Sequence, residues 1–226
     1  MKLSIIMPVF NEQHTIEKVI GEVQRQDLDK EIIIVEDYST DKTKEILQKY
    51  TGAKGINIFF QPKNMGKGAA IREGLKHVKG DAVIIQDADL EYDPSEYRKL
   101  LAKMQETGAG AVYGSRFLSG KKVTSFWHYM VNKTLTVLTN ILYGARLTDM
   151  ETCYKLIKTD VIKSIDIRSD RFDIELELTA KLLKKGIKIQ EASISYRGRG
   201  YHEGKKITWV DGLMTLAAMI KYRFKD

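Results

Sequence analysis

The alternation of two kinds of segment constrains the fold of this chain more than any other feature. Short runs of successive apolar residues recur at residues 3–10, 31–35, 56–61, 81–86 and 111–115. Between these runs, apolar residues recur at helical spacing, as Ile16, Val19 and Ile20 do. Strands that are apolar on both faces are typical of parallel sheets covered by helices. The sequence therefore predicts an α/β sandwich with a mostly parallel central sheet.

The helices of this sandwich are predicted at residues 12–26, 68–78, 95–106 and 173–185, with another around Ile46. Asn11 is expected to cap the first of them, because Asn is common at N-cap positions. The chain has 226 residues, only three prolines and no low-complexity tract. That length is enough to bury a complete core, and no linker is evident. A single domain over residues 1–226 is the prediction.

Polar clusters follow four of the predicted strands directly, at residues 8–12, 36–37, 63–68 and 87–91. The carboxyl ends of parallel strands meet at one edge of a sheet, which is where open α/β folds bind their ligands. If these were ordinary turn residues, charged pairs would be expected at both ends of the strands and not only at the carboxyl ends. The clusters are therefore expected to form one site.

The segment VIIQDADLEYDP, residues 83–94, ends a predicted strand with four closely spaced carboxylates. Like charges this close repel one another unless a cation lies among them. Mg²⁺ and Mn²⁺ prefer oxygen ligands, so a divalent metal site is one interpretation. A solvated turn is the other, because Asp is common where strands end. This segment alone leaves both open.

Composition limits the classes of partner and the cellular compartments that suit the chain. The formal net charge of +7 favours an anionic partner, and nucleic acid, nucleotide phosphates and anionic lipid all qualify. The single cysteine, Cys153, excludes an intramolecular disulfide and suits a reducing compartment. No apolar run approaches the ~20 residues of a spanning helix. A cytoplasmic protein is expected, in contact at most with the cytoplasmic face of a membrane.

Three common nucleotide motifs do not fit. A Walker A loop needs Ser or Thr after its lysine, but Gly68 follows Lys67. The segment GKGAAI has Ile71 where a dinucleotide-binding loop has its third glycine, and it follows the third strand instead of the first. A sugar nucleotidyltransferase would carry a glycine-rich loop after its first strand, where this chain reads PVFNEQ.

A set of ordered motifs does match a known family. The motifs are SIIMPVFNE, IIIVEDYSTDKT, NMGKGAAIREG, DADLEYDP, YGSRF, DMETCYKLI, RFDIELELTAKLLKKG and YRGRGYHEGKKI. In this order they resemble the inverting family 2 glycosyltransferases of the GT-A fold. Among these they look most like the dolichyl-phosphate mannose and glucose synthases and their prokaryotic polyprenyl-phosphate relatives. The chain departs from the pattern in HEGKK, which lacks a serine before the lysine, and it is expected to lack the C-terminal membrane helices that some relatives carry.

The resemblance implies transfer of mannose or glucose from a GDP- or UDP-sugar to a polyprenyl phosphate, with Mg²⁺ or Mn²⁺ as cofactor. It implies that Asp89 and Glu91 bind the metal, which acts as a Lewis acid on the departing diphosphate. Alternate residues of an extended segment point to the same side, so the spacing suits two ligands. The implied nucleotide-sugar contacts are Pro8, Phe10, Glu12, Asp37, Asp87, Ala88 and Asp89. For Asp37 a helix cap is the alternative.

Arg116 follows a strand directly and would add a fixed positive charge beside the diphosphate, unless it forms an ordinary surface ion pair. A lipid monophosphate acceptor is largely dianionic at pH 7 and needs little help from a general base. A hydroxyl acceptor needs a carboxylate base, for which Asp149 and Asp173 are the candidates. Asp173 is equally well placed to cap the helix that follows it.

The predicted domain ends in a basic loop and an amphipathic helix over residues 196–226. Glycines beside Arg197, Arg199, Lys205 and Lys206 suggest a loop that closes over the acceptor phosphate, with a solvated basic loop as the alternative. The apolar stripe from Ile207 to Phe224 is expected to pack on the core or to rest on anionic lipid.

Two other functions remain. One is sugar transfer to a hydroxyl in polysaccharide or glycolipid synthesis. The other is a nucleic-acid-binding domain, which has no recognised motif here and would meet acidic clusters where it needs cations. The prediction is an enzyme without a nucleic-acid partner.

Overall fold

A computed structural model of the chain describes residues 1–118, 126–198, 218–219 and 221–224. It contains one seven-stranded sheet in the order β3-β2-β1-β4-β6-β5-β7. The strands are β1 (Leu3–Val9), β2 (Lys30–Glu36), β3 (Ile56–Phe60), β4 (Ala82–Ile85), β5 (Ala111–Ser115), β6 (Lys155–Lys158) and β7 (Ile189–Ser193). Each strand predicted from the sequence is present, and the predicted fold class is confirmed.

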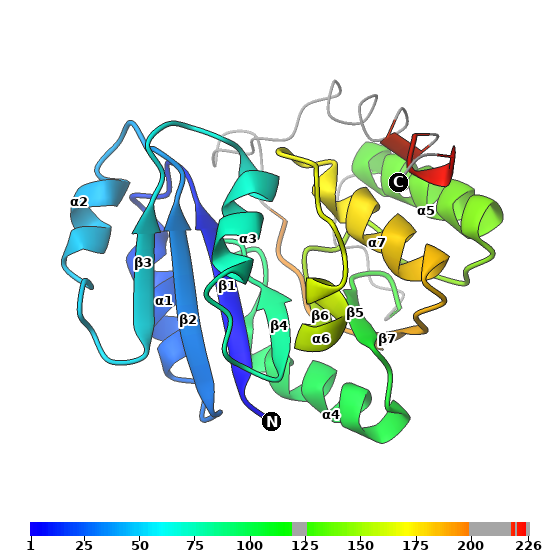
Figure 1. Ribbon diagram of the computed structural model, residues 1–226, viewed down its shortest axis with the longest axis horizontal. Helices are drawn as coiled ribbons and strands as arrows, with labels where there is room; N and C mark the ends of the chain where they lie inside the picture. Colours follow the sequence, from blue (N-terminus) through cyan, green and yellow to red (C-terminus); the bar gives the residue numbers. More distant parts are fainter. Residues whose placement is uncertain (119–125, 199–217, 220, 225–226) are drawn as a thin grey trace.

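Helices cover both faces of the sheet (Figure 1). They are α1 (Ile16–Gln24), α2 (Thr43–Gln48), α3 (Lys67–Leu75), the 3₁₀ helix η1 (Pro94–Glu96), α4 (Tyr97–Thr107), α5 (Phe126–Tyr143), α6 (Thr159–Lys163) and α7 (Ile174–Lys184). Successive strand residues face opposite cores. Ile5 packs with residues of α1 and α4, whereas Ile6 packs with residues of α3 and α7. This two-sided burial explains why the central strands carry apolar residues on both faces.

The sheet changes character at β4. The strands β3, β2, β1 and β4 are all parallel, with Ile5 of β1 opposite Ile32 on one side and Ile84 on the other. The short β6 then runs antiparallel to both β4 and β5, while β7 is parallel to β5. The carboxyl ends of the first four strands consequently lie at one edge, as predicted.

One local prediction is wrong. Asn11 is not a helix cap: it has a positive φ of 52°, and α1 begins only at Ile16. Its side-chain Oδ1 accepts from the Thr40 N–H at 2.8 Å, so residues 11–15 are used to join the β1 and β2 loops. At the other terminus, Phe224 of the predicted apolar stripe is exposed, while the neighbouring Met219 and Tyr222 are buried. The rest of the stripe lies outside the described residues.

Candidate active site

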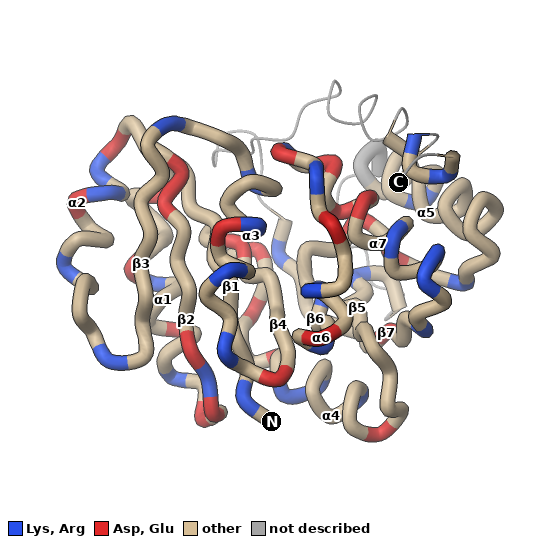
Figure 2. The backbone as a smooth tube through the Cα atoms, in the orientation of Figure 1, with Lys and Arg blue, Asp and Glu red and all other residues tan. Residues whose placement is uncertain are grey.

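The site is built at the carboxyl edge of the parallel strands, where loops carry charges of both signs (Figure 2). The loop after β1 is joined to the start of α2, because the Glu12 N–H donates to Thr43 Oγ1 at 2.8 Å. The Glu12 carboxylate accepts from Thr15 Oγ1 at 2.7 Å. Pro8 and Phe10 lie beside it, half-buried. Their contact with a base or ribose stays a prediction.

Asp37 joins the loop after β2 to the start of α3. Its two carboxylate oxygens accept from the backbone N–H groups of Met65 at 2.7 Å and Gly66 at 2.8 Å. Burial raises the pKa of the Asp37 carboxyl, while these two N–H groups act in the opposite direction. Asp37 does not cap the helix that follows it, since α2 begins six residues later at Thr43. A carboxylate has about four acceptor sites, so these bonds are compatible with a nucleotide contact.

Lys67, at the first turn of α3, is a site residue that the sequence analysis did not single out. Its ammonium lies 2.8 Å from Asp87 Oδ1, 3.1 Å from Glu175 Oε1 and 3.2 Å from Cys153 Sγ. Burial opposes the charge, but Asp87, Cys153 and Glu175 outweigh it and raise the pKa of Lys67 well above its ordinary value. Lys67 thus ties the strand-end carboxylate Asp87 to α7.

The glycines around Lys67 serve a close approach of two chain segments. A Cβ atom at Gly66 would lie 2.4 Å from the Asp170 carbonyl oxygen, and one at Gly68 would lie 2.1 Å from that of Ser169. Gly66 also has a φ of 94°, which favours glycine. The Gly68 N–H donates to the Asp170 carbonyl at 2.8 Å. The sequence NMGKG therefore places Lys67 by letting the loop before α7 lie against the start of α3.

The carboxylate segment after β4 is a turn and not extended, which corrects the geometric reason given for its spacing. Leu90, between Asp89 and Glu91, has a positive φ of 64°. The turn is fixed by the Glu91 N–H, which donates to Asp89 Oδ1 at 3.1 Å. Glu91 Oε2 accepts from the Tyr196 hydroxyl at 2.8 Å. Asp93 instead caps η1 through the Ser95 N–H.

Asp89 and Glu91 suit a divalent metal that shares its ligands with a substrate. Mg²⁺ is usually held by one or two carboxylates together with phosphate oxygens and waters. Among the residues that the structure describes, no group of three or more His, Cys, Asp or Glu side chains could hold a metal. The donor set fits an ion that arrives with a diphosphate and does not fit a closed structural site.

Arg116 is held by a buried carboxylate. Its Nε and one terminal nitrogen each lie 2.7 Å from a different oxygen of Asp149, and its backbone N–H also donates to Asp149 at 2.9 Å. The guanidinium also lies over the rings of Phe117 and Tyr196. The surface ion pair weighed as an alternative is excluded, because both side chains are buried. A contact with diphosphate remains a prediction.

The two base candidates have structural roles as well. Asp149 forms the Arg116 pair and is fully buried. Asp173 occupies the N-cap position of α7, but its side chain caps no backbone N–H. It accepts instead from the Ser169 hydroxyl at 2.7 Å.

Glu151 is a third acidic side chain, which the sequence analysis missed. Burial raises the pKa of its carboxyl to about 7, with Lys155 and Arg116 lowering it and Glu175 and Asp149 raising it. Its Oε1 atom is buried and has no hydrogen-bond partner among the described residues. A half-buried acid with a pKa near neutrality is suited to proton transfer. Its position within the motif DMETCYKLI gave no signal of this, since the burial is tertiary.

The basic loop lies mostly outside the described residues. Arg197 is described: its N–H donates to the Glu91 carbonyl at 2.9 Å, and its side chain is exposed. This bond places the start of the loop beside the carboxylate turn. Arg199, Lys205 and Lys206 are not described, so the acceptor-phosphate assignment of these residues remains a prediction.

Comparison with known proteins identifies the family. The family described as Glycosyl transferase family 2 matches residues 4–166. The chain belongs to this glycosyltransferase family. The family, the fold and the class of enzyme predicted from the sequence are thereby confirmed.

Two archaeal relatives match most of the chain. A dolichol-phosphate mannosyltransferase of Pyrococcus furiosus is 26% identical over 98% of this chain, which spans 64% of that protein. The low-salt glycan biosynthesis hexosyltransferase Agl6 of Haloferax volcanii is 30% identical over 87% of this chain, which spans 48% of that protein. The chain thus spans about half to two thirds of the length of these relatives.

Solved structures share the fold. Glucosyl-3-phosphoglycerate synthase of Mycobacterium tuberculosis, in complex with Mn²⁺, UDP and phosphoglyceric acid, superimposes with a TM-score of 0.74 at 18% identity. This match covers 100% of this chain and 79% of the synthase. S. aureus TarS in complex with UDP-GlcNAc superimposes with a TM-score of 0.67 at 19% identity, over 98% of this chain and 66% of TarS.

Proposed function

We propose that this family 2 glycosyltransferase transfers a hexosyl group, mannose or glucose, from a GDP- or UDP-sugar to a polyprenyl phosphate. The observation that carries the acceptor class is the state of the two base candidates. Asp149 is committed to a bidentate pair with Arg116, and Asp173 accepts from Ser169. A phosphate acceptor needs little general-base help at pH 7, so this arrangement suits it. The similarity to a dolichol-phosphate mannosyltransferase supports the same conclusion.

The donor would lie across the carboxyl ends of β1, β2 and β4. Asp37 would accept from the base or ribose, as carboxylates do from ring N–H groups and hydroxyls. Asp89 and Glu91 would hold Mg²⁺ or Mn²⁺, which as a Lewis acid stabilises negative charge on the departing diphosphate. Asp87 and Ala88 would line the ribose and diphosphate, with Asp87 fixed in place by Lys67.

Arg116 would face the diphosphate with its orientation already fixed. Two hydrogen bonds that the guanidinium donates to Asp149, together with two flanking rings, hold the guanidinium plane. A fixed cation loses little free energy to reorganisation when charge develops in the transition state. The acceptor phosphate would attack C1 of the sugar from the face opposite the diphosphate, which inverts the configuration. Arg197, Arg199, Lys205 and Lys206 would bind that phosphate.

Glu151 favours a second candidate, in which a hydroxyl of a glycan or glycolipid is the acceptor. Its buried, unpartnered oxygen and its pKa of about 7 are the properties of a general base. In this case the ionised Glu151 carboxylate would take the proton of the attacking hydroxyl. A phosphate dianion carries no proton that must be removed, so Glu151 would not be needed as a base for that acceptor.

The test is a panel of GDP- and UDP-sugars with either a polyprenyl phosphate or hydroxyl acceptors, in Mn²⁺ or Mg²⁺. We expect sugar to appear in the lipid-phosphate product. In Glu151→Gln, transfer to the lipid phosphate should stay within about threefold of wild type, because a lost base costs about 10²–10⁴-fold only where a proton must move. Transfer to a hydroxyl alone, abolished by Glu151→Gln, would replace the first proposal with the second.

A further inference from the structure

Exposed apolar side chains gather on α5. Among the described residues of this helix, Tyr129, Met130, Val131, Val137 and Ile141 are exposed, and Ile141 is 73% exposed. Phe224, in the C-terminal residues beside α5, is 80% exposed. Exposed hydrophobic residues are ordinary when they are scattered, but a cluster on one helix marks an interaction surface.

Three of these side chains lie on one uncharged face of α5. Met130, Val137 and Ile141, together with Thr134, follow the i, i+4, i+7, i+11 spacing of one helix face. All four are exposed, and none of them is charged. On the buried side of the same helix, Leu135 and Thr139 face the core. A helix that is apolar on its solvent side as well as its core side indicates a partner for the solvent side.

Cations border this face, and the sequence around it carries no acid. The sequence contains no Asp or Glu from residue 107 to residue 148, a stretch that includes all of α5. Arg146, just after the helix, is exposed, as are Lys221 and Arg223. The C-terminal residues that carry these last two lie against α5, since the Tyr143 hydroxyl donates to the Met219 carbonyl at 3.1 Å. An apolar stripe with a cationic border fits a negatively charged apolar partner.

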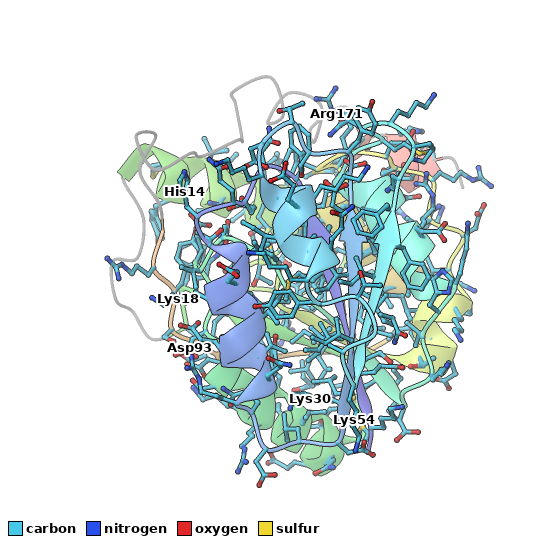
Figure 3. All side chains as sticks on the ribbon, turned by 90° about the vertical axis from the view of Figure 1, so that its left-hand side faces the viewer. His14, Lys18, Lys30, Lys54, Asp93 and Arg171 are labelled. Atoms are coloured by element: carbon cyan, nitrogen blue, oxygen red, sulfur yellow. The ribbon has the colours of Figure 1, made fainter. Side chains whose placement is uncertain are left out.

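The face also lies at the end of the molecule where the active site opens. In Figures 1 and 3, α5 and the C-terminal residues are at the same upper end as the carboxyl ends of β1–β3. Ring contacts connect the two regions: Arg116 lies over Phe117 at 5.3 Å, and the Phe117 and Tyr129 ring centroids are 5.3 Å apart. Lys30 and Lys54 lie at the opposite end (Figure 3), so positive charge alone does not mark the face.

We infer that the exposed face of α5 docks on an anionic lipid bilayer, with the helix lying in the plane of the headgroups. Its 18 residues are about 27 Å long. No helix among the described residues has the length and apolar character to cross a bilayer. A second copy of the chain fits the face less well, because a two-fold interface would bring identical cationic borders together. The inference rests in part on the proposed function, since a polyprenyl phosphate presents its phosphate at the headgroup level.

The test compares partition of the protein onto vesicles of phosphatidylcholine alone and with phosphatidylglycerol added, by co-sedimentation without any nucleotide. Wild-type protein should bind the anionic vesicles. Ile141→Glu and Val137→Glu should each lower the partition coefficient by at least about tenfold, because an acid replaces an apolar contact with lipid. Phe60→Glu is the matched control: it replaces an exposed hydrophobic side chain on β3, the strand at the far edge of the sheet, and should bind as wild type does.

Circular dichroism must show unchanged melting for all three variants. Ile141→Glu should still act on a short, water-soluble prenyl phosphate and should lose activity only on acceptor embedded in vesicles. Absence of wild-type binding, or equal binding by Ile141→Glu and Phe60→Glu, would overturn the inference. A wild-type dimer that Ile141→Glu dissociates, without vesicle binding, would assign the face to a second copy. Vesicle binding without transfer to any prenyl phosphate would refute the proposed function and leave the docking face standing.

Discussion

The two halves of the sheet hold their functional side chains by different means. Around β1 to β3, loops are joined by hydrogen bonds between side chains and backbone, as between Asp37 and the N–H groups of Met65 and Gly66. Around β5 to β7 and α7, buried ion pairs do this, including Arg116 with Asp149 and Lys155 with Glu175. Lys67 joins the two systems through Asp87 and Glu175.

The difference shows how each half depends on its neighbours. A loop that satisfies its own backbone groups tolerates the loss of one partner at a cost of about 1–3 kcal/mol. A buried charge that loses its partner costs about 3–5 kcal/mol. The second half should therefore respond more strongly to single substitutions, although it contributes fewer of the residues that the sequence assigns to the donor.

The largest expected effect is in the Arg116 pair. Asp149→Asn should lower the free energy of unfolding by about 3–5 kcal/mol, because it leaves a buried guanidinium without its countercharge. Thr43→Val removes the acceptor of the Glu12 N–H and a hydrogen bond to Asp41 from the first half, and should cost about 1–3 kcal/mol. Urea denaturation measures both. Equal losses of unfolding free energy would show that the two halves of the sheet do not differ in their response to substitution.

The second effect concerns the carboxylate turn, which should matter for turnover and not for folding. Asp89→Asn should lower kcat by at least about 100-fold, because a metal ligand is lost, and its melting temperature should be close to that of wild type. Chelation of divalent ions should abolish wild-type activity, and Mn²⁺ or Mg²⁺ should restore it. Asp93→Asn, the same change in a residue that caps η1, is the control. Full activity in EDTA would refute the metal assignment.

The third effect distinguishes binding from support at Asp37. Asp37→Ala should weaken nucleotide affinity by about 1–3 kcal/mol and should lower stability as well, since two buried N–H groups lose their acceptor. Calorimetry and denaturation measure the two quantities separately. Unchanged affinity with reduced stability would mean that Asp37 only holds the loop in place.

The smallest effect is the pH dependence that Glu151 contributes. Its folded-state pKa of about 7 lies above the unfolded value of 4.5, so the stability it contributes is complete below pH 4.5 and is lost as pH rises through 7. Glu151→Gln should therefore stabilise the protein more at pH 8 than at pH 5, by about 1 kcal/mol after allowance for solvent screening. A difference of the same size in both buffers would show that Glu151 titrates normally.

The sequence by itself determined the sandwich and the edge that carries the site. Strands such as EIIIV are apolar on both faces, and polar residues follow them at once, so a parallel sheet brings Asp37 and Asp87 to one edge whatever the details of packing. The ordered motifs were sufficient for the family. These conclusions follow from the periodicity of apolar and polar residues, which is a property of neighbouring positions along the chain.

Only the tertiary structure decided how the charges are paired. Lys67 meets Glu175 from more than a hundred positions away, and the charges that act on Glu151 come from Lys155 on β6 and Glu175 on α7 as well as from Arg116 and Asp149. The true start of α1 depends on bonds between loops, such as the one between Thr40 and Asn11. Burial and long-range hydrogen bonds set these features, because the free energy of a charge depends on what surrounds it in space and not on what precedes it in sequence.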